Sequence, residues 1–517
     1  GATIRCTIDG SEPTETRGFD YAGGIGLSTV ATIRARAFQA GWVPSPTVTR
    51  SFLVNQPALL RGVPALMLAG DWSQVFHKSN GIATIQGGIW TNGSHVTTGV
   101  PVSTNKTIAG WWFPASVDDY NIPRKRGRAF ERPISLEFAY PAENSVKQVD
   151  AGLRIAGSNH ARPRYVLQVM SNTWYGSWTS KPQLNIFFRS DYGQEPMEFK
   201  FNSALLPKTP YESFRFRAGK NDSDRPFIKD ELMRRLYAGT GQPSSCGLIA
   251  ALYVNGIFRC YYNPAERYDT GYLQARHGGT NAWDIITHGG VAEGDTIALS
   301  AAMYAATNKS MSVLSNYLAA VGKIDPVNLA DYILANAYGA TGDWPHNNYA
   351  CAIERVTGGK LRFYMWDAEM SFGHGGGLSN THDTIYQCRT LNNTAARSAI
   401  VFKALYASPE FRLVMADRIH KHFYNGGAYT LTNIQARFDA LREEADPLLI
   451  HVRGSGITNT YMSIFTNWFR LRSPNLYTQF RTNNVWPATG PALFVTPAGS
   501  YTNGTVVTLA NTNAGGG

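Results

Sequence analysis

The segment "TGDWPHNNYA" (341–350) gathers an acid, a histidine and two asparagines around one proline. Asp343 and Asn348 lie five positions apart, as D-x-x-x-x-N. A carboxylate at the first position can orient a hydroxyl group and accept its proton, and an amide oxygen at the second can bind Mg²⁺. The residue types and their spacing therefore indicate phosphoryl transfer.

Two further acids follow in "LRFYMWDAEMSFG" (361–373). A turn at "TGGK" (357–360) predicts a hairpin that joins this strand to the one after Asn348. Protein kinases have the same order of Asp, Asn, hairpin and a metal-binding Asp, so Asp367 is a candidate metal ligand. Alternate residues of a strand share a face, and we therefore expect Glu369 to join the metal site.

The same residues have a purely structural interpretation. Asp343 could cap a turn, Asn348 could satisfy a loop backbone, and Asp367 could pair with an arginine. From the spacing alone, we slightly favour the structural interpretation.

The elements that position these residues change in character along the chain. Strand patterns dominate from 55 to about 220, with an Asn255-Gly256 hairpin turn soon after, and helical periodicity dominates from 225 onward. This order predicts an α+β fold with a strand-rich and a helix-rich lobe and a cleft between them. The expected strands are "PALMLAG", "RPISLEFAY", "AGLRIAG", "QLNIFFRS" and "ESFRFRAG"; the expected helices lie within 225–243, 327–340, 398–424, 431–452 and 461–482.

Composition limits the partners. The 517 residues contain no apolar run near twenty residues, so we expect no membrane span. The formal charge of +11 has one dense cluster, "PRKRGRAFER" (123–132), which could bind nucleic acid or phosphate, or be a solvated connector. We favour the connector and expect no nucleic-acid partner. The five cysteines share no CxxC spacing, which argues against a zinc site or a disulfide framework and leaves one or two bridges open.

Both ends of the chain are rich in short strands and turns. Residues 1–54, with "TIDGSEPT" and "TIRARAF", resemble the second half of a chitobiase/β-hexosaminidase C-terminal-type Ig-like module, and "GPALFVTPAGSYTNGTVVTLANT" (490–512) resembles its first half. Either the sequence is a window of a longer polypeptide, which we favour, or a neighbouring copy completes each half-sandwich.

The region between them, roughly 60 to 482, resembles the CotH family of spore-coat-type atypical protein kinases. The resemblance rests on stretches in family order: "RAFERPISLEFAYP", "QVDAGLRIAG", "FRFRAGKNDSD", "FIKDELMRRLYAGTGQP", "LYVNGIFRCYYNPAERYD", "DWPHNNY" and "LRFYMWDAEMSFG". It implies a kinase-like fold, ATP with Mg²⁺ or Mn²⁺, transfer to Ser or Thr hydroxyls of proteins, and a secreted or cell-surface bacterial protein. We therefore expect partial β-sandwich modules at 1–54 and 486–517 around a kinase-like domain at 55–485.

The resemblance also assigns roles. Asp343 corresponds to the catalytic aspartate, Asn348 and Asp367 to metal ligands, and Lys181 to a strand lysine that binds the nucleotide's phosphates. Glu266 corresponds to a glutamate that orients this lysine.

Structural alternatives and one departure from the family accompany these assignments. Lys181 could be an exposed strand-end residue, and Glu266 could form a buried salt bridge with Arg267 or Arg217. The turn after "GLRIAG" is lengthened here (158–180), and this insertion could cover or block the nucleotide.

Two classes of function remain. One is a metal-dependent Ser/Thr protein kinase acting on surface or extracellular proteins. The other is a non-catalytic component of a surface layer or fibre, a homo-oligomer assembled through its β-modules. A third hypothesis, carbohydrate binding by the sandwich modules, has less support.

Overall fold

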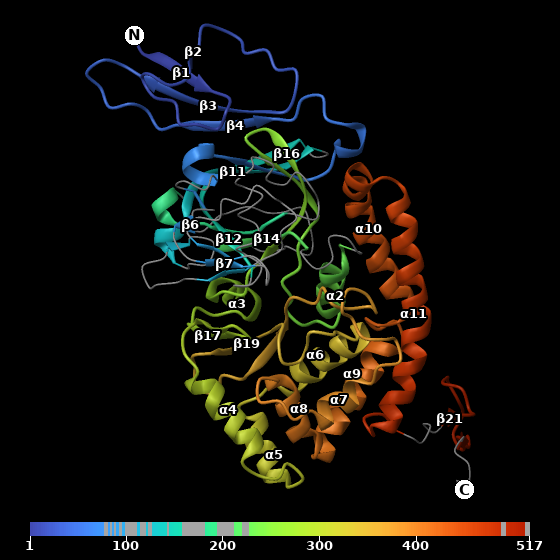
Figure 1. The fold of residues 1–517 in the computed structure, drawn as a ribbon. Helices are drawn as coiled ribbons and strands as arrows, with labels where there is room; N and C mark the ends of the chain where they lie inside the picture. Colours follow the sequence, from blue (N-terminus) through green and yellow to red (C-terminus); the bar gives the residue numbers. More distant parts are fainter. Residues whose placement is uncertain are drawn as a thin grey trace.

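The computed structural model describes residues 1–76, 81–82, 85–86, 89–91, 96–98, 111–113, 120–121, 127–141, 144–157, 181–193, 211–219, 227–487 and 493–511. The fold is mixed α+β, with β-structure in the first half and most helices in the second (Figure 1). The expected change of character along the chain is thus confirmed.

The first fifty residues form one antiparallel sheet in the order β2-β1-β3-β4. Its strands are β1 (Thr3–Thr7), β2 (Phe19–Asp20), β3 (Ala31–Phe38) and β4 (Val48–Phe52). The sheet lies at the top of Figure 1. An ion pair of 2.6 Å between Arg17 Nη1 and Asp71 Oδ2 connects it to the segment after β5 (Ala65–Ala69). Residues 1–54 therefore supply a single sheet, as one half of a sandwich would.

Seven strands form a closed barrel in the order β11-β12-β13-β14-β16-β15-β5. Their bounds are β5 (Ala65–Ala69), β11 (Arg132–Tyr140), β12 (Ser145–Ala156), β13 (Gln183–Phe187), β14 (Ser213–Arg217), β15 (Ala250–Val254) and β16 (Ile257–Glu266). Alternate residues of β11, among them Leu136 and Phe138, fill the barrel interior. The predicted hairpin turn at Asn255-Gly256 is confirmed between β15 and β16, where both residues have positive φ.

Closure of the barrel depends on pairing across the sequence. The early strand β5 pairs in parallel with β15 and antiparallel with β11. Short strands lie between β5 and β11: β6 (Ile85–Gln86) pairs with β10 (Tyr120–Asn121), and β7 (Ile89–Thr91) pairs with β8 (Val96–Thr98) and β9 (Trp111–Phe113).

A second antiparallel sheet, β18-β17-β19-β20, lies among the helices. Its strands are β17 (Trp283–Thr287), β18 (Gly290–Glu293), β19 (Tyr349–Glu354) and β20 (Arg362–Met365). The helices are α2 (Lys229–Ala238), α3 (Thr270–His277), α4 (Ile297–Thr307), α5 (Leu314–Val321), α6 (Pro326–Gly339), α7 (Thr384–Thr390), α8 (Arg397–Tyr406), α9 (Pro409–Phe423), α10 (Leu431–Arg453) and α11 (Gly456–Thr482).

Helix α6 forms the centre of the helical half. The Asp325 side chain accepts hydrogen bonds from the amides of Val327 and Asn328, and Pro326 occupies the first turn, where its missing N–H costs nothing. Every residue from 328 to 339 is buried, and the helix ends where Ala340 adopts the left-handed conformation. The buried helix thus gives the polar segment after it a fixed starting point.

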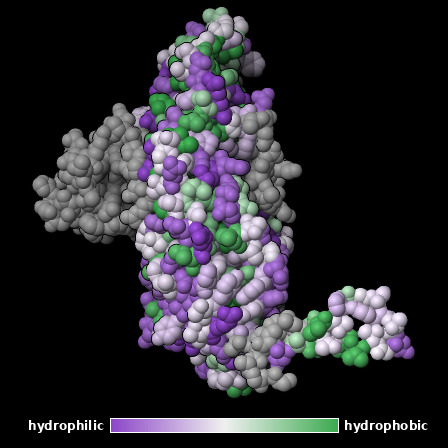
Figure 2. All heavy atoms as spheres, turned by 90° about the vertical axis from the view of Figure 1, so that its right-hand side faces the viewer, coloured by the Kyte–Doolittle hydropathy of each residue, from purple (hydrophilic) through white to green (hydrophobic). Residues whose placement is uncertain are grey.

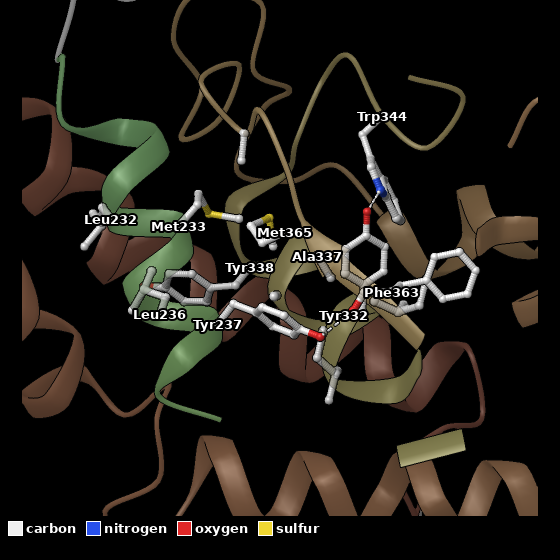
Figure 3. Close-up of a cluster of buried hydrophobic side chains, with 14 of the residues drawn as sticks. Leu232, Met233, Leu236, Tyr237, Tyr332, Ala337, Tyr338, Trp344, Phe363 and Met365 are labelled. Atoms are coloured by element: carbon white, nitrogen blue, oxygen red, sulfur yellow. Dashed lines mark hydrogen bonds between the residues drawn. The ribbon is translucent and has the colours of Figure 1, made fainter. Parts of the chain in front are cut away.

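Helix α2 packs its apolar side against α6 and β20. Figure 3 shows Tyr237 of α2 beside Tyr332 of α6 and Phe363 of β20. The Tyr237 hydroxyl donates to the Phe363 carbonyl at 2.8 Å and accepts from Asn328 Nδ2 at 2.9 Å. Because these polar atoms are paired inside the core, α2 has one defined orientation relative to the hairpin.

Helices α10 and α11 pack together on one side of the molecule, and Figure 2 shows that the face they present is mainly polar. After α11, the pair β21 (Leu493–Phe494) and β22 (Leu509–Ala510) projects from the body as an arm with exposed Phe494 and Val506.

The five cysteines are all buried and all free. No helix in the described part of the chain is long and apolar enough to cross a membrane.

Candidate active site

The polar segment after α6 brings Asp343 and Asn348 together. One carboxylate oxygen of Asp343 accepts a hydrogen bond from Asn347 Nδ2 at 2.9 Å, and the other accepts from Asn348 Nδ2 at 3.3 Å. The Asp343 side chain is 35% exposed. A carboxylate held in this way can still meet a hydroxyl group from solvent.

Asn348 stands immediately before β19, as predicted. Its φ is 51°, in the left-handed region that Asn tolerates better than most residues. Its backbone N–H donates a hydrogen bond to His288 Nδ1 at 3.2 Å. Because Nδ2 donates to Asp343, the carbonyl oxygen is the side-chain atom that can ligate a cation.

Trp344 anchors this segment to the core. Its indole Nε1 donates to the Tyr332 hydroxyl at 2.8 Å, and the indole is fully buried (Figure 3). The neighbour of Asp343 is thereby fixed to α6.

Two backbone features hold the Asp343 segment against the turn that carries Asp367. The Gly342 amide donates to the Met370 carbonyl at 2.8 Å. In addition, Tyr349 pairs with Met365 across the β19–β20 hairpin. The segments that hold the two predicted aspartates are therefore neighbours, although they are more than twenty residues apart in the sequence.

Asp367 lies in a turn, not in a strand. We predicted a strand through Glu369 that would place both acids on one face, and this is wrong because β20 ends at Met365 and residues 368–369 form a turn. Asp367 has φ of 56°. Asp tolerates this left-handed conformation better than most residues, and such conformations are frequent at functional sites.

Arg217, at the end of β14, connects these acids to α2. Its Nε lies 2.6 Å from Asp230 Oδ2, one Nη bonds directly to Asp367 Oδ1, and the same Nη lies 3.9 Å from Glu369 Oε2. The Arg217 side chain is 8% exposed and that of Asp367 is 29% exposed. One arginine thus joins a buried carboxylate to one that reaches the surface.

The pKa values follow this arrangement. Burial by itself would lower the pKa of Arg217, but Asp230, Asp367 and Glu369 together raise it well above its usual value. Burial would raise the pKa of Asp230, but Arg217 and Arg234 outweigh it and lower that pKa. The pair is therefore charged at any physiological pH.

The acidic network extends along α2 to α10. It contains five carboxylates and three guanidinium groups, which is a formal charge of −2. Its members are Arg217, Asp230, Glu231, Arg234, Arg235, Asp367, Glu369 and Glu444. Within this network Asp367 and Glu369 share one cation, Arg217.

The donor chemistry fits Mg²⁺ or Mn²⁺, since Asp367, Glu369 and the Asn348 amide are hard oxygen ligands. Among the described residues, no group of three or more His, Cys, Asp and Glu side chains is arranged to hold a metal ion. A site built on the two carboxylates would need a further oxygen ligand, and Arg217 competes with a metal for both.

Glu266 lies at the end of β16 and forms its ion pair with Arg276 of α3, not with either arginine named from the sequence. Burial is the main influence on this carboxyl group and raises its pKa to about 7; Arg276 opposes the rise and Asp269 adds to it. The exposed alternative for Lys181 is wrong, because this residue is only 2% exposed. Its Nζ donates to the Tyr261 carbonyl at 2.6 Å and lies over the Tyr261 and Phe227 rings.

A small cleft of about 20 Å³, with room for about one water molecule, lies beside this network, between the barrel and the turn after β20. Four arginines and two acids line it: Arg215, Arg217, Arg234, Arg267, Glu266 and Asp367. Trp366 also lines the cleft, with the Arg215 guanidinium 4.8 Å from its ring centre. Asp343 and Asn348 do not line it. The predicted insertion at 158–180 falls outside the described residues.

Arg217, Asp230 and Arg234 were not predicted from the sequence as site residues. One signal was available, since "KDELMRRLYA" carries five charges in a ten-residue helix, and all five side chains are buried. Buried charges need partners, so a charged helix assigned to the core would have indicated a network.

Comparison with known proteins agrees with part of the resemblance. Residues 200–451, just under half of the chain, match the family model described as CotH kinase protein. Residues 1–52 match the model described as Fn3 associated, so the predicted likeness to chitobiase-type modules stays a prediction. No curated protein matches the chain. Asp343, Asn348, Asp367, Glu369 and Glu266 fall inside the CotH match, and Lys181 falls outside it.

Proposed function

We propose that the chain is a metal-dependent protein kinase that transfers the γ-phosphate of ATP to Ser or Thr hydroxyls. The observation that carries this proposal is the contact between the Asp343 segment and the Asp367 turn through Gly342 and Met370. This contact makes the segments that carry Asp343 and the two acids Asp367 and Glu369 neighbours, which supports a site with a hydroxyl-orienting carboxylate and carboxylate metal ligands. The CotH match over residues 200–451 supports the same chemistry.

In this proposal Asp343 orients the acceptor hydroxyl and takes its proton. The hydroxyl oxygen forms a bond to the γ-phosphorus as the bond from that phosphorus to the β–γ bridging oxygen breaks, and ADP leaves. Asn348, Asp367 and Glu369 would hold the cation. When bound, the cation would offset the negative charge of the phosphates. For Lys181 to bind phosphate, its ammonium would have to leave the Tyr261 carbonyl.

The wider setting belongs to the same proposal. The barrel and the helical half would be the two lobes of a kinase-like domain over residues 55–485, with partial β-modules at 1–54 and 486–517. The Fn3-associated match and the CotH match support a bacterial protein that is secreted or held at the cell surface. Its substrates would be proteins of that surface, and copies of the chain would assemble through the β-modules.

A second function is favoured by one observation. Arg217 neutralises Asp367 within the network, as it would in a kinase-like scaffold that binds no metal and assembles a surface layer or fibre. A folded wild-type chain that bound no nucleotide with either Mg²⁺ or Mn²⁺ would select this function.

Turnover measurements test the kinase proposal. ADP release from ATP is followed with Mg²⁺ or Mn²⁺ and a mixture of Ser/Thr-rich proteins, for wild type, Asp343→Asn and Asp367→Asn. We expect Asp343→Asn to retain nucleotide binding but lose about 10²–10⁴-fold in turnover, since a general base contributes about that much. If Asp343→Asn turned over ATP as fast as the wild type, the role of Asp343 as the general base would be wrong.

A further inference from the structure

Arg217 has two kinds of partner. Its Nε is bonded to Asp230, which is buried in α2, and its Nη is bonded to Asp367, which faces the cleft. We propose that Arg217, not Lys181, is the cation that binds the nucleotide's phosphates, and that it holds Asp367 and Glu369 until a divalent cation replaces it there. This inference rests on the proposed function.

The anchor at Asp230 makes such an exchange feasible. Asp230 also accepts a hydrogen bond of 2.8 Å from the Ala368 amide, and Arg234 lies 3.2 Å away. This carboxylate is therefore fixed on three sides. A guanidinium group is a planar fork with several donors, so Arg217 can keep its Nε bond to Asp230 while its Nη groups change partner.

Arg234, the other buried arginine among the described residues that line the cleft, lacks this freedom. Arg234 bonds to the Ser245 carbonyl and Asn263 Oδ1, in addition to Asp230 and Glu231. All of these partners are buried. Turning Arg234 toward the cleft would leave several buried acceptors unpaired, which is costly.

Lys181 is held in a different way. Its single charged nitrogen donates to the Tyr261 carbonyl and lies 3.6 Å from the centre of the Tyr261 ring and 4.7 Å from that of Phe227. Among the described residues, a carbonyl and aromatic faces contact this ammonium group, and such contacts stabilise a cation without a phosphate. The geometry therefore favours a structural role for Lys181.

Charge explains why Arg217 would change partner. Without a metal, its guanidinium offsets two carboxylates that would otherwise repel each other. A divalent cation at Asp367 and Glu369 takes over that role and leaves the Nη groups of Arg217 facing the cleft. Phosphate oxygens match the guanidinium fork and become the better partner. Arg217 should accordingly oppose binding of a bare cation and favour binding of a nucleotide.

These opposite effects give a sharp test. Mn²⁺ binding without nucleotide is measured by electron paramagnetic resonance, and binding of ATP and of adenosine with Mn²⁺ by calorimetry. Wild type is compared with Arg217→Lys, which keeps the charge but loses the fork, and with Lys181→Met, which keeps the length and apolar stem. Circular dichroism and thermal melting verify that each variant is folded.

We expect Arg217→Lys to weaken ATP binding by about tenfold or more and adenosine binding little, because one bidentate phosphate contact is lost. The same variant should bind Mn²⁺ alone more tightly than wild type. Lys181→Met should leave all three affinities near those of wild type. A purely structural role for Arg217 would weaken ATP and adenosine alike and would not raise the Mn²⁺ affinity.

Two results would overturn the assignment. In the first, Arg217→Lys binds ATP as wild type does while Lys181→Met does not, so Lys181 is the phosphate ligand and the proposed function stands. In the second, the wild type binds no ATP with Mn²⁺, which rejects the proposed function and this inference with it.

Asp230→Asn is a further test of the same proposal. The variant retains an acceptor for the Ala368 amide, and it should weaken ATP binding because the Nε group of Arg217 loses its charged partner.

Discussion

The amide of Gly342 donates a 2.8 Å hydrogen bond to the carbonyl of Met370, and this contact joins the two halves of the candidate site. The first segment carries Asp343 and the second carries Asp367 and Glu369. Neither segment belongs to a helix or strand at these positions. This contact, the 2.8 Å hydrogen bond from the Phe372 amide to the Gly339 carbonyl and the β19–β20 hairpin together fix their relative placement.

Gly342→Ala should separate the two segments. A Cβ atom at this position would clash with the carbonyl oxygen of Gly376, a backbone atom that cannot move aside by changing rotamer. Overpacking of this kind costs about 1–3 kcal/mol, and we expect a lower melting temperature together with lost ATP turnover. Gly456→Ala is the matched control, because its Cβ meets nothing within 4 Å. Equal behaviour of the two variants would contradict the assigned role of the contact.

The Trp344–Tyr332 hydrogen bond should stabilise the segment that carries Asp343. Tyr332→Phe leaves the buried indole N–H without its acceptor, at a cost of about 1–3 kcal/mol. Chemical denaturation of Tyr332→Phe, Trp344→Phe and the double variant measures the coupling between them. If the losses in free energy of unfolding of the two single variants add up to that of the double variant, the hydrogen bond contributes no coupling energy to stability.

The ion pair between Arg235 and Glu444 should fix α2 against α10. Both Arg235 Nη atoms contact the Glu444 carboxylate, at 2.8 and 2.7 Å, and Arg235 is buried. Glu444→Ala should lower the free energy of unfolding by about 1–3 kcal/mol, the usual cost of leaving a charged group without its hydrogen-bond partner. The exposed neighbour Glu443 provides the control, and Glu443→Ala should change stability by less than about 0.5 kcal/mol. A Glu443→Ala loss as large as that of Glu444→Ala would refute this prediction.

Glu266 should make stability depend on pH. Its folded pKa of about 7 is above the ordinary value of 4.5, so the protonated form is favoured in the folded state. This stabilisation is complete below pH 4.5 and is lost as the pH rises through 7. Relative to wild type, Glu266→Gln should therefore become more stable with rising pH, on the order of 3 kcal/mol between pH 4.5 and 8. Unfolding titrations at several pH values check this, and a constant difference between the proteins would be inconsistent with the raised pKa.

Local patterns in the sequence predicted the barrel strands, the β19–β20 hairpin and most of the long helices, because periodicity and turn residues act over short distances. They did not predict β17 and β18 of the second sheet. The hairpin at Asn255-Gly256 and the position of Asn348 before β19 are confirmed. Shorter helices such as α3 and α7 were not predicted, since one or two turns give too little periodicity to recognise.

Contacts between distant segments could not be read from local patterns. Closure of the barrel needs the parallel pairing of β5 with β15, almost two hundred residues later. The ion pair of Arg217 with Asp367 spans 150 residues. The burial of Lys181 likewise depends on aromatic residues of β16 and the segment before α2, so its strand-end position suggested exposure and was misleading.

We propose above all that Asp367 and its neighbours form a metal-dependent nucleotide site. The most direct measurement is calorimetric titration of ATP, with and without Mn²⁺, into wild type and into Asp367→Asn of equal thermal stability. We expect ATP binding by the wild type to require the cation and to fall by about tenfold or more in the variant, because a charged ligand of the metal is removed. Undiminished binding by Asp367→Asn, or none by the folded wild type, would contradict this proposal.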